Sequence, residues 1–540
     1  MRRIACGVSA PGREAPAIAR NFRYPSFMQL RVWLACLLVI LFSPAPGATA
    51  NVVLEETSLG DASGYQPVKA VTFSTDSRHL AFLGVKGDSQ FVVRDGVESK
   101  PFDWIIPDSL AGPLSLTRLA FIIQNGNDMA AVVDGQAVGS GYYFVGADRI
   151  TFSDDGKHYA YTVRRGSTTD GKASVIRDGV EGKPYSAAAV VPTFSPDGKH
   201  LAYTAASGIA KVFMVNDDKE DQAYDNIVPG TTTFSPDSKH LAYSAVSGGK
   251  FLAVIDGKAS KPYDQMRMTP IFSPNSARTA YIAGSGQQFF VVIDGVEGPK
   301  FDAFTDGSVI FSPNSQHIAY AARKDKQWVM LLDGKEQQTF DAIAGESIHF
   351  SPDSAHLSYV GIIGKQRFVI FDGKPGKAYD NILWPGPIFS PDSKQVAFAG
   401  SRGGQLSVVA DGVDGPAYDN VAELAFTADS KHLFYRAVSK GKALVVVDGK
   451  ESQPFDNTTP VVFSDDSAHY SFAAQLGSSS AIWIDGVATP NSYTGWVKGS
   501  RPSFVAPGSI DFLMVRERQF LQVRARIDGG TVATTHPIGR

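Results

Sequence analysis

One motif recurs along this 540-residue chain about once every 39 residues, and this repeat restricts the possible folds more than any other feature. Its clearest copy, residues 233–264, reads Thr-Phe-Ser-Pro-Asp-Ser-Lys-His-Leu-Ala-Tyr, then an apolar run ending in Asp-Gly, then Pro-Tyr-Asp. The phenylalanine of the motif recurs at Phe73, Phe152, Phe194, Phe234, Phe272, Phe311, Phe350, Phe389, Phe426, Phe463 and Phe504. A worn copy between the first two, marked by Leu119-Ala120-Phe121 and Asp134-Gly135, brings the number to about twelve.

The signals within one copy predict four short antiparallel strands. The first strand ends in Phe-Ser, and Ser-Pro-Asp-Ser forms a tight turn because proline fixes φ and aspartate bonds its own backbone. His-Leu-Ala-Tyr begins the second strand, a Gly/Ser/Lys loop leads to an apolar third, and Asp-Gly suits the hairpin turn to a fourth. Such a unit is a propeller blade, and blades must stack because none buries both of its faces alone. A helical solenoid is the alternative, but the turn signals are too closely spaced for helices.

The predicted fold is therefore all-β, with about twelve four-stranded blades. Propeller rings usually contain four to eight blades, so two fused propellers are expected rather than one. Six blades each would give residues 51–305 and 306–540, with Asp306-Gly307 at the junction, and a division of seven plus five stays open. Ring closure is predicted to pair Val52-Val53-Leu54 with the final copy.

A resemblance to a known family is carried by the string Phe-Ser-Pro-Asp-Gly-Lys-His-Leu-Ala-Tyr at residues 194–203. It resembles the WD-repeat-like motif of TolB-type periplasmic β-propellers, and the likeness extends over nearly all of residues 65–530. The Gly-His and Trp-Asp signatures of eukaryotic WD repeats are missing. The resemblance implies a propeller fold and an export context, but it does not carry over a role in the Tol system.

Residues 1–50 predict export. Arg31 precedes an apolar run at residues 32–42, and Ala48-Thr49-Ala50 forms a small-x-small site. Residues 29–50 therefore predict a secretory signal peptide cleaved after Ala50, and an uncleaved anchor is the alternative. Residues 1–27 are interpreted as an upstream extension or a misassigned start. The mature chain is expected to be periplasmic or secreted, with no membrane span, since a span needs about 20 apolar residues.

Charge and cysteine content exclude several classes of protein. The leader holds six basic residues and one acid, so the remainder has 45 basic and 53 acidic residues, a formal net charge of −8. An acidic surface disfavours nucleic acid as a partner, because phosphate binding relies on Lys and Arg. Both cysteines, Cys6 and Cys36, lie in the leader, so the mature chain is expected to have neither a disulfide nor a cysteine metal site.

The histidines belong to the repeat rather than to a catalytic site. Eight of the ten occupy one motif position: His79, His158, His200, His240, His317, His356, His432 and His469. We expect each to bond the Asp of the Tyr-Asp strand, such as Asp225, Asp264, Asp380 or Asp419, much as a His–Asp network does in WD blades.

The sequence contains no motif for a catalytic nucleophile, a zinc site or a phosphate-binding loop. We therefore predict no catalytic, cofactor-binding or metal-binding residues. One departure from the repeat is weighed as a calcium loop, the acidic run Asn216-Asp217-Asp218-Lys219-Glu220-Asp221. It lacks the glycine and the final bidentate glutamate of such a loop, so a solvated acidic turn is favoured.

Residues that break the repeat are the candidates for binding, because a recognition face must differ from blade to blade. They are Arg164, Arg165, Arg323, Trp328, Arg402 and Arg436, with Trp104 and Trp384 on connections between blades. Aromatic residues and Arg suit recognition surfaces. The predicted function is a binding or scaffold propeller for a protein, peptide or glycan in the cell envelope. The alternative is a propeller hydrolase or lyase with a site in the central channel.

Overall fold

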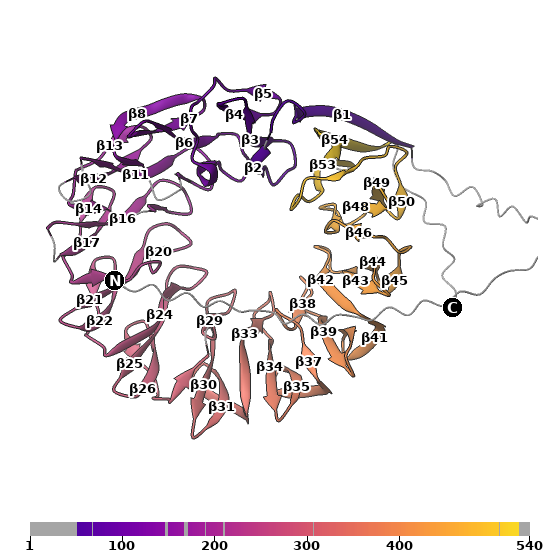
Figure 1. Cartoon of the computed structure of the whole chain (residues 1–540). Helices are drawn as coiled ribbons and strands as arrows, with labels where there is room; N and C mark the ends of the chain where they lie inside the picture. The colour runs from indigo at the N-terminus through magenta and orange to yellow at the C-terminus, as the bar shows by residue number, and fades with distance from the viewer. Residues whose placement is uncertain are drawn as a thin grey trace, which may run out of the picture. The chain divides into compact units, whose positions relative to one another are not determined.

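The computed structural model describes residues 51–528 except 67, 146–149, 167–170, 189–190, 209–210, 306 and 507. The predicted signal peptide lies outside these residues. The described chain forms twelve antiparallel sheets in sequence order, which confirms the all-β propeller prediction. Figure 1 shows them as blades around a ring. No helix among the described residues is long and apolar enough to cross a membrane.

The blades are numbered in chain order, and within each blade the strands run from the inner to the outer edge of the sheet. Blade 1 contains β2 (Val68–Phe73), β3 (Leu80–Lys86), β4 (Ser89–Arg94) and β5 (Val97–Glu98), and blade 2 contains β6 (Ala120–Asn125), β7 (Asp128–Val133) and β8 (Gln136–Tyr142), preceded by the 3-10 turn η1 (Pro107–Ser109). Blade 3 contains β9 (Phe144–Val145), β10 (Thr151–Phe152), β11 (Tyr159–Arg165), β12 (Lys172–Arg177) and β13 (Val180–Glu181). Blade 4 contains β14 (Ala187–Ala188), β15 (Thr193–Phe194), β16 (Leu201–Ala206), β17 (Val212–Asn216) and β18 (Lys219–Glu220).

Blade 5 contains β19 (Asn226–Ile227), β20 (Thr233–Phe234), β21 (Leu241–Ser247), β22 (Lys250–Ile255) and β23 (Lys258–Ala259), and blade 6 contains β24 (Gln265–Phe272), β25 (Thr279–Ser285), β26 (Gln288–Ile293) and β27 (Val296–Glu297). Blade 7 contains β28 (Ala303–Phe304), β29 (Ile310–Phe311), β30 (Ile318–Lys324), β31 (Gln327–Leu332) and β32 (Lys335–Phe340). Blade 8 contains β33 (Ala342–Phe350), β34 (Leu357–Ile363), β35 (Gln366–Phe371) and β36 (Lys374–Tyr379).

Blade 9 contains β37 (Asn381–Ile382), β38 (Ile388–Phe389), β39 (Val396–Arg402), β40 (Gln405–Ala410) and β41 (Val413–Tyr418), and blade 10 contains β42 (Asn420–Phe426), β43 (Leu433–Ser439), β44 (Lys442–Val447) and β45 (Lys450–Glu451). Blade 11 contains β46 (Asn457–Thr458), β47 (Val462–Phe463), β48 (Tyr470–Leu476), β49 (Ser479–Ile484) and β50 (Val487–Ala488). Blade 12 contains β51 (Gly495–Trp496), β52 (Ser503–Ala506), β53 (Ser509–Arg516) and β54 (Gln519–Asp528), and β1 (Asn51–Asp61) is added to it.

The turns of blade 5 show how the motif builds a blade. The Ser235 hydroxyl donates to Asp237 Oδ1 over 2.6 Å and accepts from the His240 amide over 3.0 Å, which closes the first turn. Asp256 and Gly257 have φ angles of 49° and 73°. Positive φ at both central residues is the geometry of a type I′ turn, so the predicted hairpin is confirmed.

Successive blades are joined by shared cores and by one repeated hydrogen bond. Tyr243 of β21, for example, lies in one buried cluster with Met214 of the preceding blade. Near the first turn, the Asp197 amide donates to the Ser238 hydroxyl of the next blade over 3.0 Å. The same contact from blade to blade is made by Ser276, Ser315, Ser354, Ser393 and Ser430.

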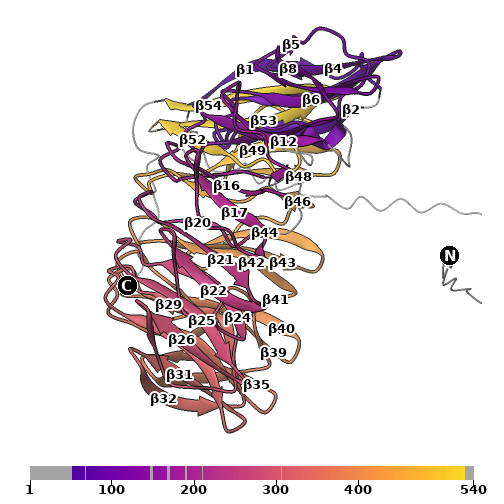
Figure 2. The same cartoon turned by 90° about the vertical axis from the view of Figure 1, so that its left-hand side faces the viewer.

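The ring closes through its first strand. β1 pairs with β54 from Asn51 opposite Asp528 to Asp61 opposite Gln519, and so supplies the outer strand of blade 12. Figures 1 and 2 both place β1 beside β54. The predicted pairing of residues 52–54 with the final copy is confirmed.

The division into two propellers is not what the structure shows, because twelve blades lie in one ring (Figure 1). At the predicted junction, Val291 of blade 6 and Tyr320 of blade 7 belong to one buried cluster. The Asn275 amide also donates to Ser315 Oγ across these blades over 3.0 Å. Blades 6 and 7 therefore pack as the other neighbours do, and among the described residues the ring is closed by the pairing of β1 with β54.

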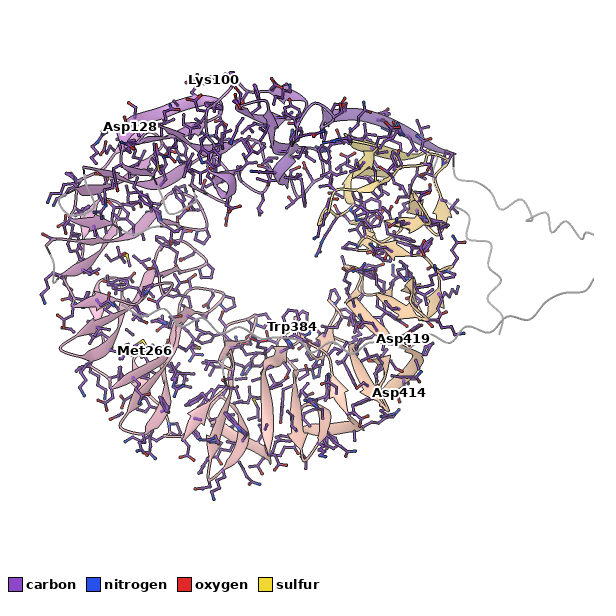
Figure 3. All side chains as sticks on the ribbon, viewed as in Figure 1. Lys100, Asp128, Met266, Trp384, Asp414 and Asp419 are labelled. Carbon is purple, nitrogen blue, oxygen red and sulfur yellow. The ribbon has the colours of Figure 1, made fainter. Side chains whose placement is uncertain are left out.

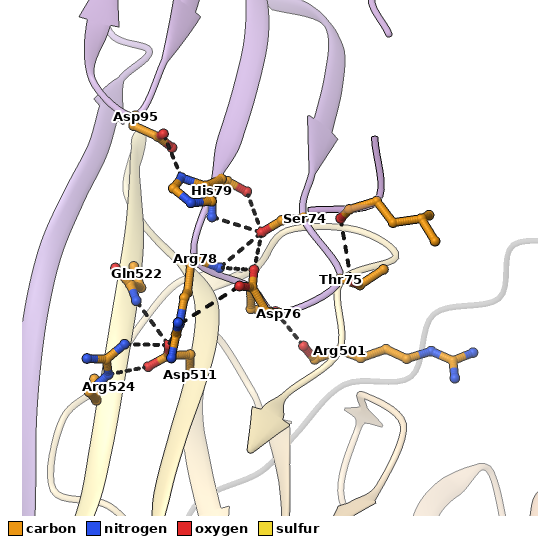
Figure 4. Close-up of polar contacts among 12 residues, drawn as sticks. Ser74, Thr75, Asp76, Arg78, His79, Asp95, Arg501, Asp511, Gln522 and Arg524 are labelled. Atoms are coloured by element: carbon orange, nitrogen blue, oxygen red, sulfur yellow. Dashed lines mark hydrogen bonds and ion pairs between the residues drawn. The ribbon is translucent and has the colours of Figure 1, made fainter. Parts of the chain in front are cut away.

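A buried ionic cluster joins blade 12 to blade 1 (Figure 4). Asp511 is fully buried, and its carboxylate accepts from Arg78 Nε of blade 1 over 3.1 Å. Arg524 donates to both carboxylate oxygens over 2.7 Å, and Gln522 donates over 3.1 Å. This carboxylate is therefore compensated by charged donors on both sides of the closure.

Candidate binding surface

The recurring histidines do form His–Asp pairs, but with a different aspartate from the one predicted. His240 Nδ1 lies 2.7 Å from Oδ2 of Asp256, the residue that begins the Asp-Gly turn, and the Leu241 amide donates to Oδ1 of the same carboxylate. The other pairs are His79–Asp95, His158–Asp178, His200–Asp217, His317–Asp333, His356–Asp372, His432–Asp448 and His469–Asp485. These contacts tie the second strand to the hairpin of its own blade.

The aspartates of the Tyr-Asp strand have another role. Asp225 Oδ2 accepts from the Gly248 amide over 2.7 Å, and thereby holds the hairpin loop of the following blade. Asp264, Asp380 and Asp419 make the same contact with the amides of Gly286, Gly403 and Lys440. The prediction of a histidine partner for these aspartates is therefore wrong, because each lies at the opposite end of the second strand from the histidine.

Two of the predicted binding arginines lie in a repeated contact between blades. Arg165 pairs with Glu181 over 2.8 Å, and its guanidinium carbon lies 4.4 Å from the ring centroid of Tyr142 in the preceding blade. Arg402 pairs with Asp414 over 3.4 Å and lies 4.2 Å from the Tyr379 ring. Arg516, Glu56 and Tyr493 form a third instance at the closure, which the sequence analysis did not find.

The other predicted residues are spread over separate blades. Arg164 precedes Arg165 in β11 of blade 3. Arg323 and Trp328 of blade 7 lie opposite each other, with the guanidinium 5.9 Å from the ring. Arg436 of blade 10 donates to Glu423 and to the Thr458 carbonyl oxygen, each over 2.7 Å. The structure does not bring the six predicted residues into one site.

A more concentrated surface lies where the inner strand of blade 9 bends between β37 and β38. Trp384 stands on this bend with 75% of its area exposed, and Figure 3 places it on the inner side of the ring. Gly386 follows with φ of 94°, and a Cβ there would lie 2.9 Å from the Ser347 Cβ of blade 8. Close packing of the bend against blade 8 therefore requires glycine, and it leaves the indole outside the core.

Beside the indole is a hollow of about 370 Å³ between blades 8 and 9, here called the Trp384 hollow. Its walls include Thr305, Glu346, Arg367, Ile382, Leu383 and Pro385. A second hollow of about 200 Å³, lined by Arg267 and Met268, has Thr305 in common with the first. The two hollows together extend over the inner strands of blades 6–9.

The walls of the Trp384 hollow are held in place by hydrogen bonds. Arg367 donates to the Asp380 carbonyl oxygen over 2.7 Å, and His349 Nε2 lies 3.2 Å from the Pro385 carbonyl oxygen. Glu346 is exposed, and Thr305 Oγ1 is buried without a hydrogen-bond partner within the described residues. An indole face, apolar walls, a carboxylate and an unsatisfied hydroxyl together suit a ligand that is part apolar and part polar.

No group of three or more His, Cys, Asp or Glu residues that could hold a metal ion occurs in the described ranges. In the acidic run weighed as a calcium loop, Asp217 contacts His200 and Glu220 pairs with Lys183 over 2.6 Å. Asp221 accepts from the Tyr243 hydroxyl. These carboxylates are therefore engaged in blade contacts.

Comparisons with known proteins do not assign the chain to a family. No protein-family model matches the chain, and no curated protein matches it. Among solved structures it is similar to TolB from Acinetobacter baumannii at 16% identity, covering 49% of this chain and 77% of that one, with a TM-score of 0.21. It is also similar to the propeller domain of the Trilobed protease from Pyrococcus furiosus, described as having an open velcro topology, at 13% identity, covering 58% and 96%, with a TM-score of 0.23. The chain is also similar to a eukaryotic initiation factor at 13% identity, covering 60% of this chain and 91% of that one, with a TM-score of 0.32. Nothing about function follows from these likenesses.

Proposed function

We propose that this chain is an exported, non-enzymatic scaffold propeller that binds a protein partner in the cell envelope at the Trp384 hollow. The observation that carries the proposal is the exposed indole of Trp384 beside a hollow with fixed polar walls. Trp and Arg are enriched among the residues that contribute most of the binding energy at protein interfaces. The two hollows share Thr305 and extend over the inner strands of blades 6–9, which favours an extended peptide segment of the partner as the bound element.

The enzymatic alternative has no specific observation in its favour among the described residues. The recurring histidines and the aspartates of the hairpin turns are engaged with each other, as in His240–Asp256. An extended peptide segment is preferred to a glycan as the bound element, because the hollow combines apolar walls such as Ile382 and Leu383 with a few polar groups.

Export is the second part of the proposal, supported by the basic and apolar leader that precedes β1. The expected result is a mature chain beginning at Asn51, checked by mass spectrometry of protein recovered from cells that express residues 1–540. Retention of the whole leader in a soluble intracellular fraction would contradict it.

The binding part is tested by placing a photo-crosslinking amino acid at position 384 in the full chain. The matched control places it at position 296, because Val296 is 71% exposed on the outer strand β27. The expected result is a reproducible protein adduct from position 384 that position 296 does not give. Equal adduct patterns from both positions, or none from 384, would overturn the proposed site.

A further inference from the structure

The inner strands of blades 6–9 are all irregular at one corresponding place, a few residues before the motif phenylalanine. In blade 6 the register of β24 against β25 shifts between Met266 and Met268, and in blade 8 that of β33 against β34 shifts between Ala344 and His349. In blades 7 and 9 the inner strand is divided at this place, into β28 and β29 and into β37 and β38. Such irregularities direct side chains out of the regular ladder. We call this place the inner bend of a blade.

The residue at the inner bend differs from blade to blade. It is Arg267 in blade 6, Thr305 in blade 7, Glu346 in blade 8 and Trp384 in blade 9, and all four line the two hollows that share Thr305. Arg267 and Glu346 are exposed, and neither forms a salt bridge with another described residue. Arg267 instead lies with its guanidinium carbon 4.9 Å from the Phe289 ring centroid. The hollows therefore present one uncompensated positive charge and one uncompensated negative charge.

The blades on either side differ in this respect. Blade 10 has Glu423 at its inner bend, but Arg436 of the same blade neutralises it over 2.7 Å. Blade 5 has Val228 and Pro229 there, which carry no charge. Among the described residues of blades 5–10, the uncompensated charges at the inner bends therefore lie in blades 6 and 8, within the reach of the two hollows.

We propose, on the basis of the function proposed above, that the bound peptide segment carries three side chains in a fixed order. These are an acidic one against Arg267, a basic one against Glu346 and an apolar one on the Trp384 indole. Each charge of the segment then meets an opposite charge without a partner of its own, and complementarity of this kind sets the register of a bound segment. A segment with the two charges exchanged meets a like charge at both places and is rejected.

The stacking of the blades gives the spacing of these side chains. Packed sheets lie about 10 Å apart and an extended chain advances about 3.3 Å per residue, so neighbouring blades correspond to about three residues of the segment. Arg267 and Glu346 are two blades apart, and Trp384 is one blade further on. The acidic and basic side chains are therefore about six residues apart, with the apolar one about three residues beyond the basic one.

The test measures binding of four ten-residue peptides of one composition to the full chain by fluorescence anisotropy. The first peptide has Asp, Lys and Leu at its positions 1, 7 and 10, with serine and glycine between them, and the second has Asp and Lys exchanged. The other two are these sequences in reverse order, because a segment can run in either direction across the blades. In the direction that binds better, the first pattern is expected to bind about fivefold more tightly than its charge-exchanged counterpart, as two exposed ion pairs imply.

An exchange of charges in the protein makes the result decisive. The variant with both Arg267→Glu and Glu346→Arg is expected to prefer the charge-exchanged peptide by a similar factor. The matched control exchanges the outer-rim pair, by Lys261→Glu and Glu297→Lys, and is expected to keep the original preference.

Trp384→Ala separates this inference from the function on which it rests. It is expected to weaken the binding of every peptide. Equal binding of the two charge patterns that Trp384→Ala still abolishes would overturn the order of charges and leave the proposed site in place. Binding that Trp384→Ala does not change would overturn both. Absence of binding by all four peptides would overturn the three-residue pattern, and the crosslinking at position 384 then decides on the site alone.

Discussion

Blades 5 and 12 follow the same four-strand plan but are held together by different forces. Blade 5 is one continuous stretch of chain, and its His240–Asp256 pair ties strand to hairpin with both side chains more than 40% exposed. Blade 12 takes its outer strand from the other end of the described chain, and its Asp511 is fully buried between Arg78 and Arg524. Local turn chemistry connects the strands of a regular blade, whereas closure depends on buried charge and on strand pairing between distant residues.

The largest expected effect on stability distinguishes the closure at blade 12 from a regular blade. Asp511→Ala removes the fully buried carboxylate and leaves the partly exposed guanidinium groups of Arg78 and Arg524 without it, which is expected to cost about 2 kcal/mol. Chemical denaturation followed by tryptophan fluorescence measures the loss. The matched control is Glu336→Ala, which breaks the exposed Lys324–Glu336 pair and is expected to cost less than about 1 kcal/mol. Equal losses in the two variants would contradict the special role of the closure.

A smaller effect, on the pH dependence of stability, also distinguishes the closure from the regular blades. The hydrogen bond from Arg516 is the main reason why the pKa of Glu56 is lowered to about 2, with Tyr493 and Asn491 adding to it. Because the folded-state pKa is depressed, the stabilisation is present above the usual glutamate pKa and is lost as pH falls from about 4.5 towards 2. Allowing for partial exposure, it amounts to about 1 kcal/mol.

The measurement is the melting temperature of the parent chain and of Glu56→Gln between pH 6 and pH 3. The expected difference is largest at pH 6 and shrinks as pH falls. Glu297→Gln is the control, because it removes the outer-rim Lys261–Glu297 pair within regular blades, away from the closure. A difference for Glu56→Gln that stays constant over this range would contradict the assignment.

A still smaller effect belongs to the regular blades. His240→Gln is expected to lower stability by less than about 1 kcal/mol, because the pair is exposed and glutamine can keep part of the contact. Blade 9 already has this arrangement, with Gln395 Nε2 donating to Asp411 over 3.4 Å. Denaturant titration of His240→Gln beside His240→Ala checks it, and a larger loss for glutamine than for alanine would be inconsistent with a retained bond.

The sequence predicted what local chemistry determines. The Asp-Gly pair specifies the hairpin between the third and fourth strands in most blades, as Asp256-Gly257 does in blade 5, so the strands and the twelve blades followed from the repeat. The aspartate that pairs with His240 could not be predicted from the repeat, because Asp256 and Asp264 are both near it in sequence. Only the positions of the strands in the blade determine that the partner is Asp256. The number of blades per ring depends on the angle between packed neighbours, which no single residue encodes. The Trp384 hollow likewise requires the inner strands of separate blades to meet.

The smallest expected effect on stability is at Trp384, which serves neither a regular blade contact nor the closure. Its side chain is 75% exposed, so Trp384→Ala is expected to change the free energy of unfolding by less than about 0.5 kcal/mol. The same substitution should abolish partner capture by a crosslinker placed at the neighbouring position 346, since the exposed indole is proposed as the anchor of the partner. The control is Trp328→Ala, because Trp328 is half-buried against Arg323 and is expected to lose stability while retaining capture. If Trp384→Ala destabilised the protein as Asp511→Ala does, the indole would be part of the framework of the ring, and its exposure would no longer indicate a binding surface.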